Sequence, residues 1–340
     1  MSDMAADDYE RFARAALAQY KLESATVTLL SVSENGTFLV ETSDRREVLR
    51  VHRRGYHSLA AIESELDWMD SVRRDSSIRT PQVIPAADGR RVVEVRIGDD
   101  VRLVDVFTFV PGTMAEDDAA DISFGDLGAI TAALHEHVRH WTPPPTFTRF
   151  RWDLDTMLGA GGRWGNWRDA PALSAADAAA IEEAERKVID RLTRYGTGPE
   201  RFGLVHNDLR MSNLMVHEEN ITVIDFDDCG WSWYLADLGA VVSFIEDTPE
   251  AARIVYDWLD GYRRVRPIPV SDLAEIPTFV MLRRLMLTAW IGTHPESEPA
   301  KTLGHCFASG TAALAQTYVT DPSWLQFDAA APTAHSTTSR

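Results

Sequence analysis

The chain has 340 residues, of which 45% are hydrophobic and 25% charged, so it can bury one large or two medium cores and is not mainly disordered. Its 52 acidic and 34 basic side chains give a formal net charge of -18, which argues against nucleic-acid and membrane-surface partners. The chain has only two cysteines, which predicts that it has no disulfide framework. Its N-terminus is acidic, unlike a signal peptide, and it has no long apolar run, so we expect a cytoplasmic protein.

The first 110 residues are predicted to be mainly β. Apolar periodicity and turn residues predict an amphipathic helix over 5–20, three strands within 26–53, a helix over 58–74, and two strands over 90–97 and 101–110. Pro111 and Gly112 then interrupt the pattern, which makes them the predicted domain boundary.

Helices dominate the predicted second region. An apolar stripe runs from Leu127 to Trp141, and the Ala- and Glu-rich segment 174–195 is a strong helix former. The segment 143–171 is rich in Pro, Gly and Trp and is predicted to be an irregular connector. Residues 111–340 carry 33 acidic and 19 basic side chains, so this region suits a cationic ligand or a metal.

The segment that begins GLVHNDLRMSN is the most informative. His206, Asp208 and Asn213 have the spacing H-x-D-x-x-x-x-N, and the apolar hairpin LMVHEENITVI then leads to Asp225. Phosphoryl transfer needs a carboxylate that orients the attacking hydroxyl and oxygen ligands that hold Mg²⁺. One loop can place Asp208 and Asn213 on the same side, and the hairpin returns Asp225 beside them. The simpler interpretation, ordinary turn residues, is disfavoured by so many elements in the expected order.

The motifs LVHNDLRMSNLMV and VIDFDDCGWSWYLADL resemble those of the aminoglycoside phosphotransferase and choline kinase superfamily. Within it they are most similar to the branch of type II homoserine kinases and the bacterial stress-response Ser/Thr kinase. The resemblance covers about residues 10–320 and implies an α+β, bilobal protein-kinase-like fold that binds ATP between its lobes. We expect a small antiparallel-sheet N-lobe at 1–110, a larger mainly helical C-lobe at 111–327, and a disordered tail at 328–340.

The resemblance also implies roles for individual residues. Asp208 corresponds to the catalytic base, Asn213 and Asp225 to the Mg²⁺ ligands, and His206 to a support of the catalytic loop. By the same analogy Asp237 braces that loop through backbone hydrogen bonds, so we leave it out of the catalytic residues.

Nucleotide contacts are expected mainly from the first region. Arg50 stands where kinases have a strand lysine that pairs with an acidic residue on the next helix. Glu65 lies on the apolar stripe of that helix and should reach a cation; Glu63 ranks second, and an exposed surface Glu is the alternative. The other predicted contacts are Ser33, Asn35, Gly36 and Thr37, which equally fit an ordinary hairpin turn, and the hinge residues Thr108, Phe109 and Val110, which also fit a plain linker.

These features predict an ATP- and Mg²⁺-dependent phosphotransferase whose acceptor is a small hydroxyl compound: an aminoglycoside, an amino alcohol or a homoserine-like molecule. Arg210 is a candidate contact for an acceptor carboxylate, and Asp227 a candidate second carboxylate near the metal or the substrate. The alternatives are a protein Ser/Thr kinase of the stress-response type and an inactive nucleotide sensor. No A-P-E segment or long activation loop follows Asp225, which favours a small acceptor.

Two further clusters are expected to be structural. His135, His137 and His140 lack the H-E-x-x-H spacing of a helical metal site. Four tryptophans lie in or just before the connector: Trp141, Trp152, Trp164 and Trp167. They are expected to pack the connector onto helices rather than to line an acceptor pocket.

Overall fold

The computed structural model describes residues 6–32, 34–117, 122–321 and 325. Contacts group the chain into two units. Unit 1 comprises Met1–Ala120, Trp141–Phe150 and Ser212–Asp227, and unit 2 comprises Asp121–His140, Arg151–Met211 and Asp228–Arg340. Unit 1 thus takes in two later segments, and the division into lobes at residue 110 stays a prediction. The predicted tail, 328–340, lies outside the described residues.

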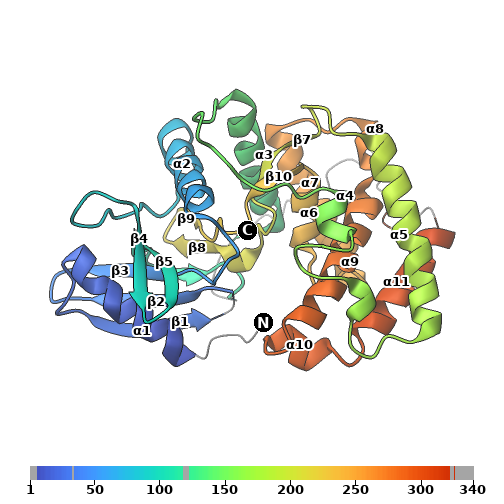
Figure 1. The fold of residues 1–340 in the computed structure, drawn as a ribbon. Helices are drawn as coiled ribbons and strands as arrows, with labels where there is room; N and C mark the ends of the chain where they lie inside the picture. The colour runs from blue at the N-terminus through green and yellow to red at the C-terminus, as the bar shows by residue number, and fades with distance from the viewer. Residues whose placement is uncertain (1–5, 33, 118–121, 322–324, 326–340) are drawn as a thin grey trace, which may run out of the picture. The chain divides into compact units, whose positions relative to one another are not determined.

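Five antiparallel strands form the main sheet of unit 1 in the order β1-β2-β3-β5-β4 (Figure 1). Their bounds agree with the predicted strands to within a few residues: β1 Thr26–Val32, β2 Gly36–Glu41, β3 Arg46–Val51, β4 Val92–Ile97 and β5 Asp100–Thr108. A smaller three-stranded sheet of the same unit has the order β6-β8-β9: β6 Thr113–Met114, β8 Leu214–His217 and β9 Asn220–Val223.

The two faces of the main sheet differ in character. Helix α1 (Ala6–Ala16) and the 3-10 turn η1 (Leu17–Tyr20) pack on the apolar face, which buries Phe38, Leu49, Val51, Val104 and Val106. Because side chains alternate along a strand, Arg50 and Asp105 point to the other face. Helix α2 (Leu59–Asp75) begins after Ser58, whose Oγ accepts from the Ala61 amide at 3.2 Å, as predicted for a helix that starts at 58.

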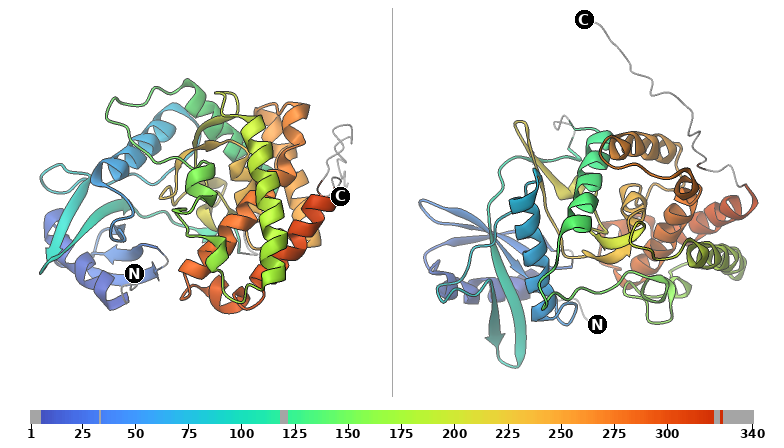
Figure 2. Two further views of the ribbon diagram at one scale, coloured as in Figure 1. Left: turned by 45° about the vertical axis from the view of Figure 1, so that its right-hand side comes forward. Right: turned by 90° about the horizontal axis from the view of Figure 1, so that it is seen from above.

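Unit 2 is mainly helical. Its longer helices are α3 Phe124–His140, α5 Ala175–Tyr195, α7 Pro249–Val265, α9 Ile276–Thr293 and α11 Phe307–Thr320, and its shorter ones are α4 Leu154–Leu158, α6 Ala236–Val241, α8 Val270–Leu273 and α10 Glu298–Leu303. Helix α3 packs on α7, and α5 runs beside α11 (Figure 2). Strands β7 (Phe202–Val205) and β10 (Gly230–Trp233) pair antiparallel.

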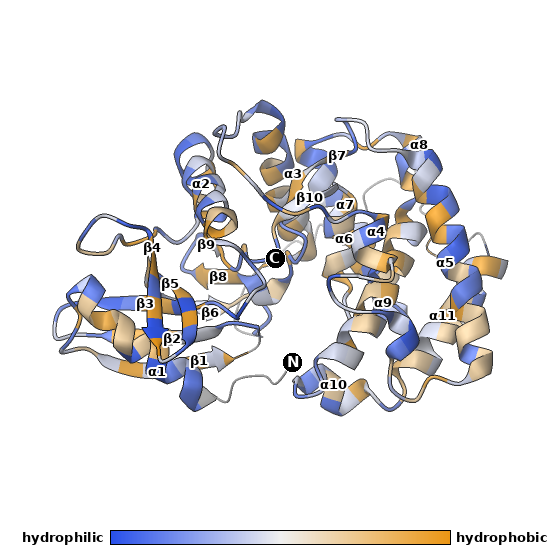
Figure 3. Ribbon diagram, in the orientation of Figure 1, coloured by the Kyte–Doolittle hydropathy of each residue, from blue (hydrophilic) through white to orange (hydrophobic). Residues whose placement is uncertain are grey.

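Helix α9 is the apolar centre of unit 2 and appears mostly orange in the hydropathy view (Figure 3). It packs against α5, α6 and α11 and against the 3-10 turn η2 (Trp167–Asp169). The predicted irregular connector is therefore only partly irregular, because it contains α4 and η2. Asp153 caps α4 through a reciprocal capping box with Thr156, a local signal that the sequence prediction missed. Within the described part of the chain, no helix is long and apolar enough to span a membrane.

Candidate active site

Arg50 is the centre of a buried charge cluster in unit 1. The register of β3 and β5 pairs it with Asp105, which accepts hydrogen bonds from Nε at 3.1 Å and from Nη2 at 2.7 Å. Glu65 on α2 is fully buried and lies 2.9 Å from the same Nη2, so the predicted ion pair is confirmed. Burial would raise the pKa of Asp105, but Arg50 and His52 outweigh it and lower this pKa to about 2.

The second-ranked glutamate has a different partner. Glu63 is one-third exposed and accepts from Nε of Arg91 at 2.7 Å, so the ranking of Glu65 above Glu63 is confirmed. Glu65 also faces Arg149, whose Nη1 lies 3.7 Å from Oε2 and donates to the Ala61 carbonyl at 3.1 Å. A residue from the predicted connector therefore completes the charge cluster.

Two of the predicted nucleotide contacts, Ser33 and Asn35, fall between β1 and β2. Ser33 lies outside the described residues. Asn35 is buried, and its Oδ1 accepts from the amide of Arg53 at 2.9 Å. This side chain therefore ties the turn to the chain that follows β3, which is a structural role compatible with either interpretation of the turn.

Gly36 and Thr37 begin β2. A Cβ built on Gly36 would lie 2.7 Å from Cγ of Tyr9, so close packing of this aromatic ring requires glycine here whatever the turn binds. Thr37 pairs with Arg50 in the register of β2 and β3. The two residues thus lie next to the charge cluster, and their contact with a nucleotide stays a prediction.

The predicted hinge, Thr108 to Val110, follows the end of β5. The Thr108 amide donates to the Gln82 carbonyl at 2.8 Å, and Thr108 Oγ1 accepts from the Gln82 amide at 3.0 Å. The Arg46 guanidinium lies over the ring of Phe109, 3.9 Å from its centroid. The Thr108 amide is therefore already engaged, and any hydrogen bond that a backbone amide of this segment donates to a base falls to the residues after it.

Asn213 and Asp225 flank the β8–β9 hairpin of unit 1. Leu214 pairs with Val223, and the Ile224 amide donates to the Asn213 carbonyl at 3.0 Å, which brings the two ends together. Asp225 has a φ of +61°, a left-handed conformation that costs free energy in a residue with a Cβ. Carboxylate and amide oxygens are the ligands that Mg²⁺ prefers, so this donor set fits the predicted metal site.

Asp227, two residues after Asp225, belongs to the charge cluster around Arg50. It is 5% exposed, and its Oδ1 lies 3.4 Å from Nε2 of His57 and 3.8 Å from both Nη1 of Arg50 and Nδ1 of His52. Burial would raise the pKa of Asp227, but these three neighbours hold it well below its usual range. An ionised carboxylate therefore faces the Arg50 side chain, and its role in metal or substrate binding stays a prediction.

Asp208 follows β7 in unit 2 and is held by two arginines. Nη2 of Arg283 donates to Oδ1 at 2.6 Å, and Nη2 of Arg210 donates to Oδ2 at 3.2 Å. Burial would raise the pKa of Asp208, but Arg210, Arg283 and His206 outweigh it and lower the pKa. The side chain keeps 18% of its surface exposed, so part of the ionised carboxylate remains accessible from solvent. The side chain of Arg210 is also partly exposed, at 33%.

Asp237 braces the predicted catalytic loop, as expected. Its Oδ1 accepts from the Asn207 amide at 2.5 Å, and its Oδ2 lies 2.9 Å from Nε2 of His135. Nη1 of Arg266 donates to the Tyr262 hydroxyl at 2.8 Å, which leaves that hydroxyl to donate to His135 Nδ1, also at 2.8 Å. Burial lowers the pKa of His135, so a neutral ring that donates from Nε2 fits both contacts.

Two tryptophans of the connector, Trp152 and Trp167, serve packing, as predicted. Trp152 is fully buried and its Nε1 donates to the Asp228 carbonyl at 2.8 Å, while Trp167 donates to Glu185 Oε1 at 2.9 Å. These bonds satisfy the indole groups inside unit 2. A structural role is confirmed for these two residues.

The sequence prediction missed Asp105, Arg149 and Arg283. Asp105 had a readable signal, since it is an acidic residue inside the apolar stretch VRLVDVFTFV. Arg283 had one as well, because it is half of an Arg-Arg pair within a mainly apolar helix that carries no other charged residue. A buried charge in such a setting needs a partner. Arg149 had no such signal, because it lies in an irregular segment rich in other polar residues.

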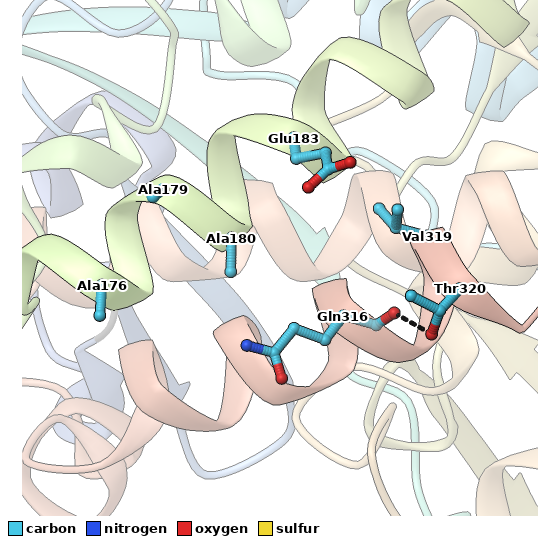
Figure 4. Close-up of a pocket in the computed structure, with 7 residues that line it drawn as sticks. All are labelled: Ala176, Ala179, Ala180, Glu183, Gln316, Val319 and Thr320. Carbon is cyan, nitrogen blue, oxygen red and sulfur yellow. Dashed lines mark hydrogen bonds between the residues drawn. The ribbon is translucent and has the colours of Figure 1, made fainter.

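A hollow of about 280 Å³ lies between α5 and α11 (Figure 4). Its lining offers one carboxylate, from Glu183, and otherwise mainly small side chains: Ala176, Ala179, Ala180, Gln316, Val319 and Thr320. None of these residues belongs to the charge cluster around Arg50 or to the groups that hold Asp208. The hollow therefore carries no chemistry for phosphoryl transfer.

Comparison with known proteins connects this geometry to a family. The model of the phosphotransferase enzyme family matches residues 26–268. The structure of a microcompartment-associated aminopropanol kinase is 43% identical, covers 93% of this chain and 99% of its own, and has a TM-score of 0.86. An amicoumacin kinase bound to AMP-PNP, Ca²⁺ and amicoumacin shares the fold, with 21% identity, coverage of 95% and 96%, and a TM-score of 0.74. Amicoumacin kinase of Bacillus subtilis is 22% identical over 80% of this chain and 81% of its own length.

Proposed function

Because the chain belongs to the phosphotransferase enzyme family, we propose that it transfers the γ-phosphoryl group of ATP to the hydroxyl of a short amino alcohol. Its class is that of a small-molecule kinase with an alcohol group as acceptor. One observation carries the choice of acceptor, namely the 43% identity with the aminopropanol kinase along nearly the full length of both chains.

The nucleotide-binding and metal-binding roles fall to unit 1. Arg50, fixed by Asp105 and Glu65, presents a cation for the phosphates of ATP. Asn213 and Asp225 would hold Mg²⁺, which when bound neutralises charge on the phosphates. The fixed register of β8 and β9 supports this assignment, because it keeps the two ligands together without help from the metal.

The acceptor is assigned to Asp208 in unit 2. Its carboxylate orients the acceptor hydroxyl and takes up the proton that leaves as the oxygen bonds to phosphorus. The paired guanidiniums keep it ionised, which is the state that this role requires. Arg210 already binds Asp208, so the proposed role of Arg210 toward an acceptor carboxylate requires that it exchange partners.

The proposal extends to the setting of the enzyme. A net charge of -18 supports small-molecule partners rather than nucleic acid. Cys229 and Cys306 are not joined by a disulfide, which fits a reducing compartment and supports a cytoplasmic location.

An ADP-release assay with Mg²⁺-ATP tests the acceptor class. Aminopropanol, ethanolamine, choline, homoserine and an aminoglycoside are compared at equal concentration, and each product is identified by phosphorus NMR. We expect the largest kcat/KM for aminopropanol. Phosphorylation of the aminoglycoside without turnover of any short amino alcohol would remove the proposed acceptor while leaving the enzyme class intact.

A further inference from the structure

Arg283 of α9 lies beside Asn207 and Asp208 in unit 2. It is 5% exposed and uses each of its three guanidinium nitrogens on a different group. Nε donates to Ser243 Oγ at 2.9 Å, Nη1 to the Asn207 carbonyl at 3.1 Å, and Nη2 to Asp208 Oδ1 at 2.6 Å. The planar fork thus fixes the backbone before the catalytic residue and its carboxylate at once.

The Asn207 peptide is held from both sides. Its amide donates to Asp237, and its carbonyl accepts from Arg283. Asn207 has a φ of +67°, a left-handed conformation that asparagine tolerates better than most residues but that still needs support. The loop therefore keeps an unfavourable conformation because Asp237 and Arg283 hold it. Of these two residues, Arg283 also binds Asp208.

The two oxygens of Asp208 are held unequally. Oδ1 faces the buried Arg283, whereas Oδ2 faces Arg210, whose side chain is 33% exposed. A buried charge-assisted hydrogen bond is held firmly, while a partly exposed pair exchanges partners at little cost. We infer that Arg283 is a positioning residue that anchors Oδ1 of Asp208 and so presents Oδ2 to the acceptor hydroxyl. This inference rests on the proposed catalytic role of Asp208.

A carboxylate held by two arginines is a weak base, and the chemistry tolerates this. Phosphoryl transfer passes through a loose transition state, in which the attacking hydroxyl has formed little bond to phosphorus and need not yet have lost its proton. Orientation of the hydroxyl therefore contributes more than the basicity of the carboxylate. Arg283 therefore supplies geometry, and loss of its fork should lower turnover rather than substrate binding.

The next residue of α9 provides a matched control. Arg284 is also buried and also ion-paired, with Nη1 2.9 Å from Glu246 Oε2 and 3.2 Å from Asp247 Oδ1. Its Nε donates to Thr311 Oγ1 at 2.8 Å. It serves the packing of unit 2 without a bond to the catalytic loop, so Arg284→Lys imposes a similar change in the same helix.

The test compares Arg283→Lys with Arg284→Lys, since lysine keeps the charge but cannot serve three directions. We expect Arg283→Lys to lower kcat by about 10-fold to 100-fold with unchanged KM for ATP and acceptor. Arg284→Lys should keep the wild-type kcat even where its thermal midpoint falls. Equal kcat in Arg283→Lys and wild type, or equal losses in both variants, would overturn the inference.

Two further measurements separate positioning from the catalytic assignment. In an Asp208→Asn background, Arg283→Lys should cause no additional loss of kcat, because it acts through the missing carboxylate; an additive loss contradicts this route. Hydrogen exchange of residues 206–210 needs no acceptor and should accelerate in Arg283→Lys but not in Arg284→Lys. Unchanged exchange overturns the inference even if the acceptor is wrong. Full activity of Asp208→Asn overturns the proposed catalytic role and with it the presentation of Oδ2 to the acceptor, while the anchoring of the loop by Arg283 is still judged by the exchange rates.

Discussion

Arginine at position 50 changes what the surrounding residues must do. A strand lysine can be held by one glutamate, whereas the larger guanidinium of Arg50 donates two hydrogen bonds to the carboxylate of Asp105 and also forms the ion pair with Glu65. Removing three charged side chains from water is costly, so the cluster is stable only because its partners satisfy one another. Asp105 is therefore as important for the orientation of Arg50 as the predicted partner Glu65.

The pKa of Asp105 makes this cluster sensitive to acid. Its folded-state pKa of about 2 lies below the ordinary value of 3.8, so the carboxylate stabilises the fold above pH 4, and this contribution is lost as the pH falls toward 2. We expect Asp105→Asn to lower the free energy of unfolding at pH 6. Between pH 6 and pH 2 the free energy of unfolding of this variant should fall by about 2 kcal/mol less than that of the wild type. Urea unfolding between pH 6 and pH 2 measures this, and Asp190→Asn on the exposed face of α5 is the control. Parallel pH profiles of wild type and Asp105→Asn would contradict it.

Asp208→Asn is the direct test of the catalytic role proposed for Asp208. The change is nearly isosteric, so Arg283 and Arg210 can still approach, but the carboxylate that is proposed to take up the acceptor proton is lost. We expect turnover to fall by about 100-fold to 10,000-fold while the affinity for Mg²⁺-ATP stays close to wild type. Steady-state kinetics with aminopropanol and nucleotide titration measure the two effects separately. A turnover number near that of wild type would return the nucleotide-sensor alternative to contention.

Among the secondary-structure elements, periodicity predicted most strands and helices of unit 1 but not how the strands pair with one another. The strand around Arg50, the helix that begins after Ser58 and the hairpin between Asn213 and Asp225 follow from alternation, a helix cap and turn residues, which are local signals. The pairing of Arg50 with Asp105 depends on the strand order β3-β5, which joins segments 55 residues apart. No local pattern contains that information.

The helices of unit 2 show the same limit. The apolar stripe that starts at Leu127 predicted α3, but not that α3 approaches α7 closely enough to require glycine. A Cβ on Gly261 would lie 1.7 Å from the Gly125 carbonyl oxygen. Such close contacts lie between elements, and a single sequence read in isolation gives only the glycine and not its reason.

This contact gives a prediction for the α3–α7 pair. Gly261→Ala cannot be accommodated without separating the helices, so we expect it to lower the free energy of unfolding by about 1 to 3 kcal/mol. Gly161→Ala is the control, because its Cβ would meet nothing within 4 Å. Thermal unfolding of both variants measures the difference. Similar midpoints for Gly261→Ala and wild type would show that α3 and α7 pack less closely than described.

For the whole molecule, charge and metal have to be considered together. The chain carries a net charge of -18, and ATP is itself an anion, so general electrostatics oppose nucleotide binding. The charge cluster around Arg50 offsets this only locally, because its cation already faces the carboxylates of Glu65, Asp105 and Asp227. Binding of ATP should therefore depend on a divalent cation that joins the phosphates to the acidic ligands.

We accordingly expect removal of Mg²⁺ with a chelator to weaken ATP binding by at least roughly tenfold, or about 1.4 kcal/mol. By linkage, ATP should tighten Mg²⁺ binding by the same factor. Asp225→Asn should weaken binding of Mg²⁺-ATP and reduce the effect of the chelator, whereas Asp208→Asn should leave both unchanged, since only Asp225 is assigned to the metal. Calorimetric titration of nucleotide with and without Mg²⁺ measures all three proteins in the same way. An equal affinity for ATP in both conditions would remove Asn213 and Asp225 from the metal site and leave Arg50 as the main contact for the phosphates.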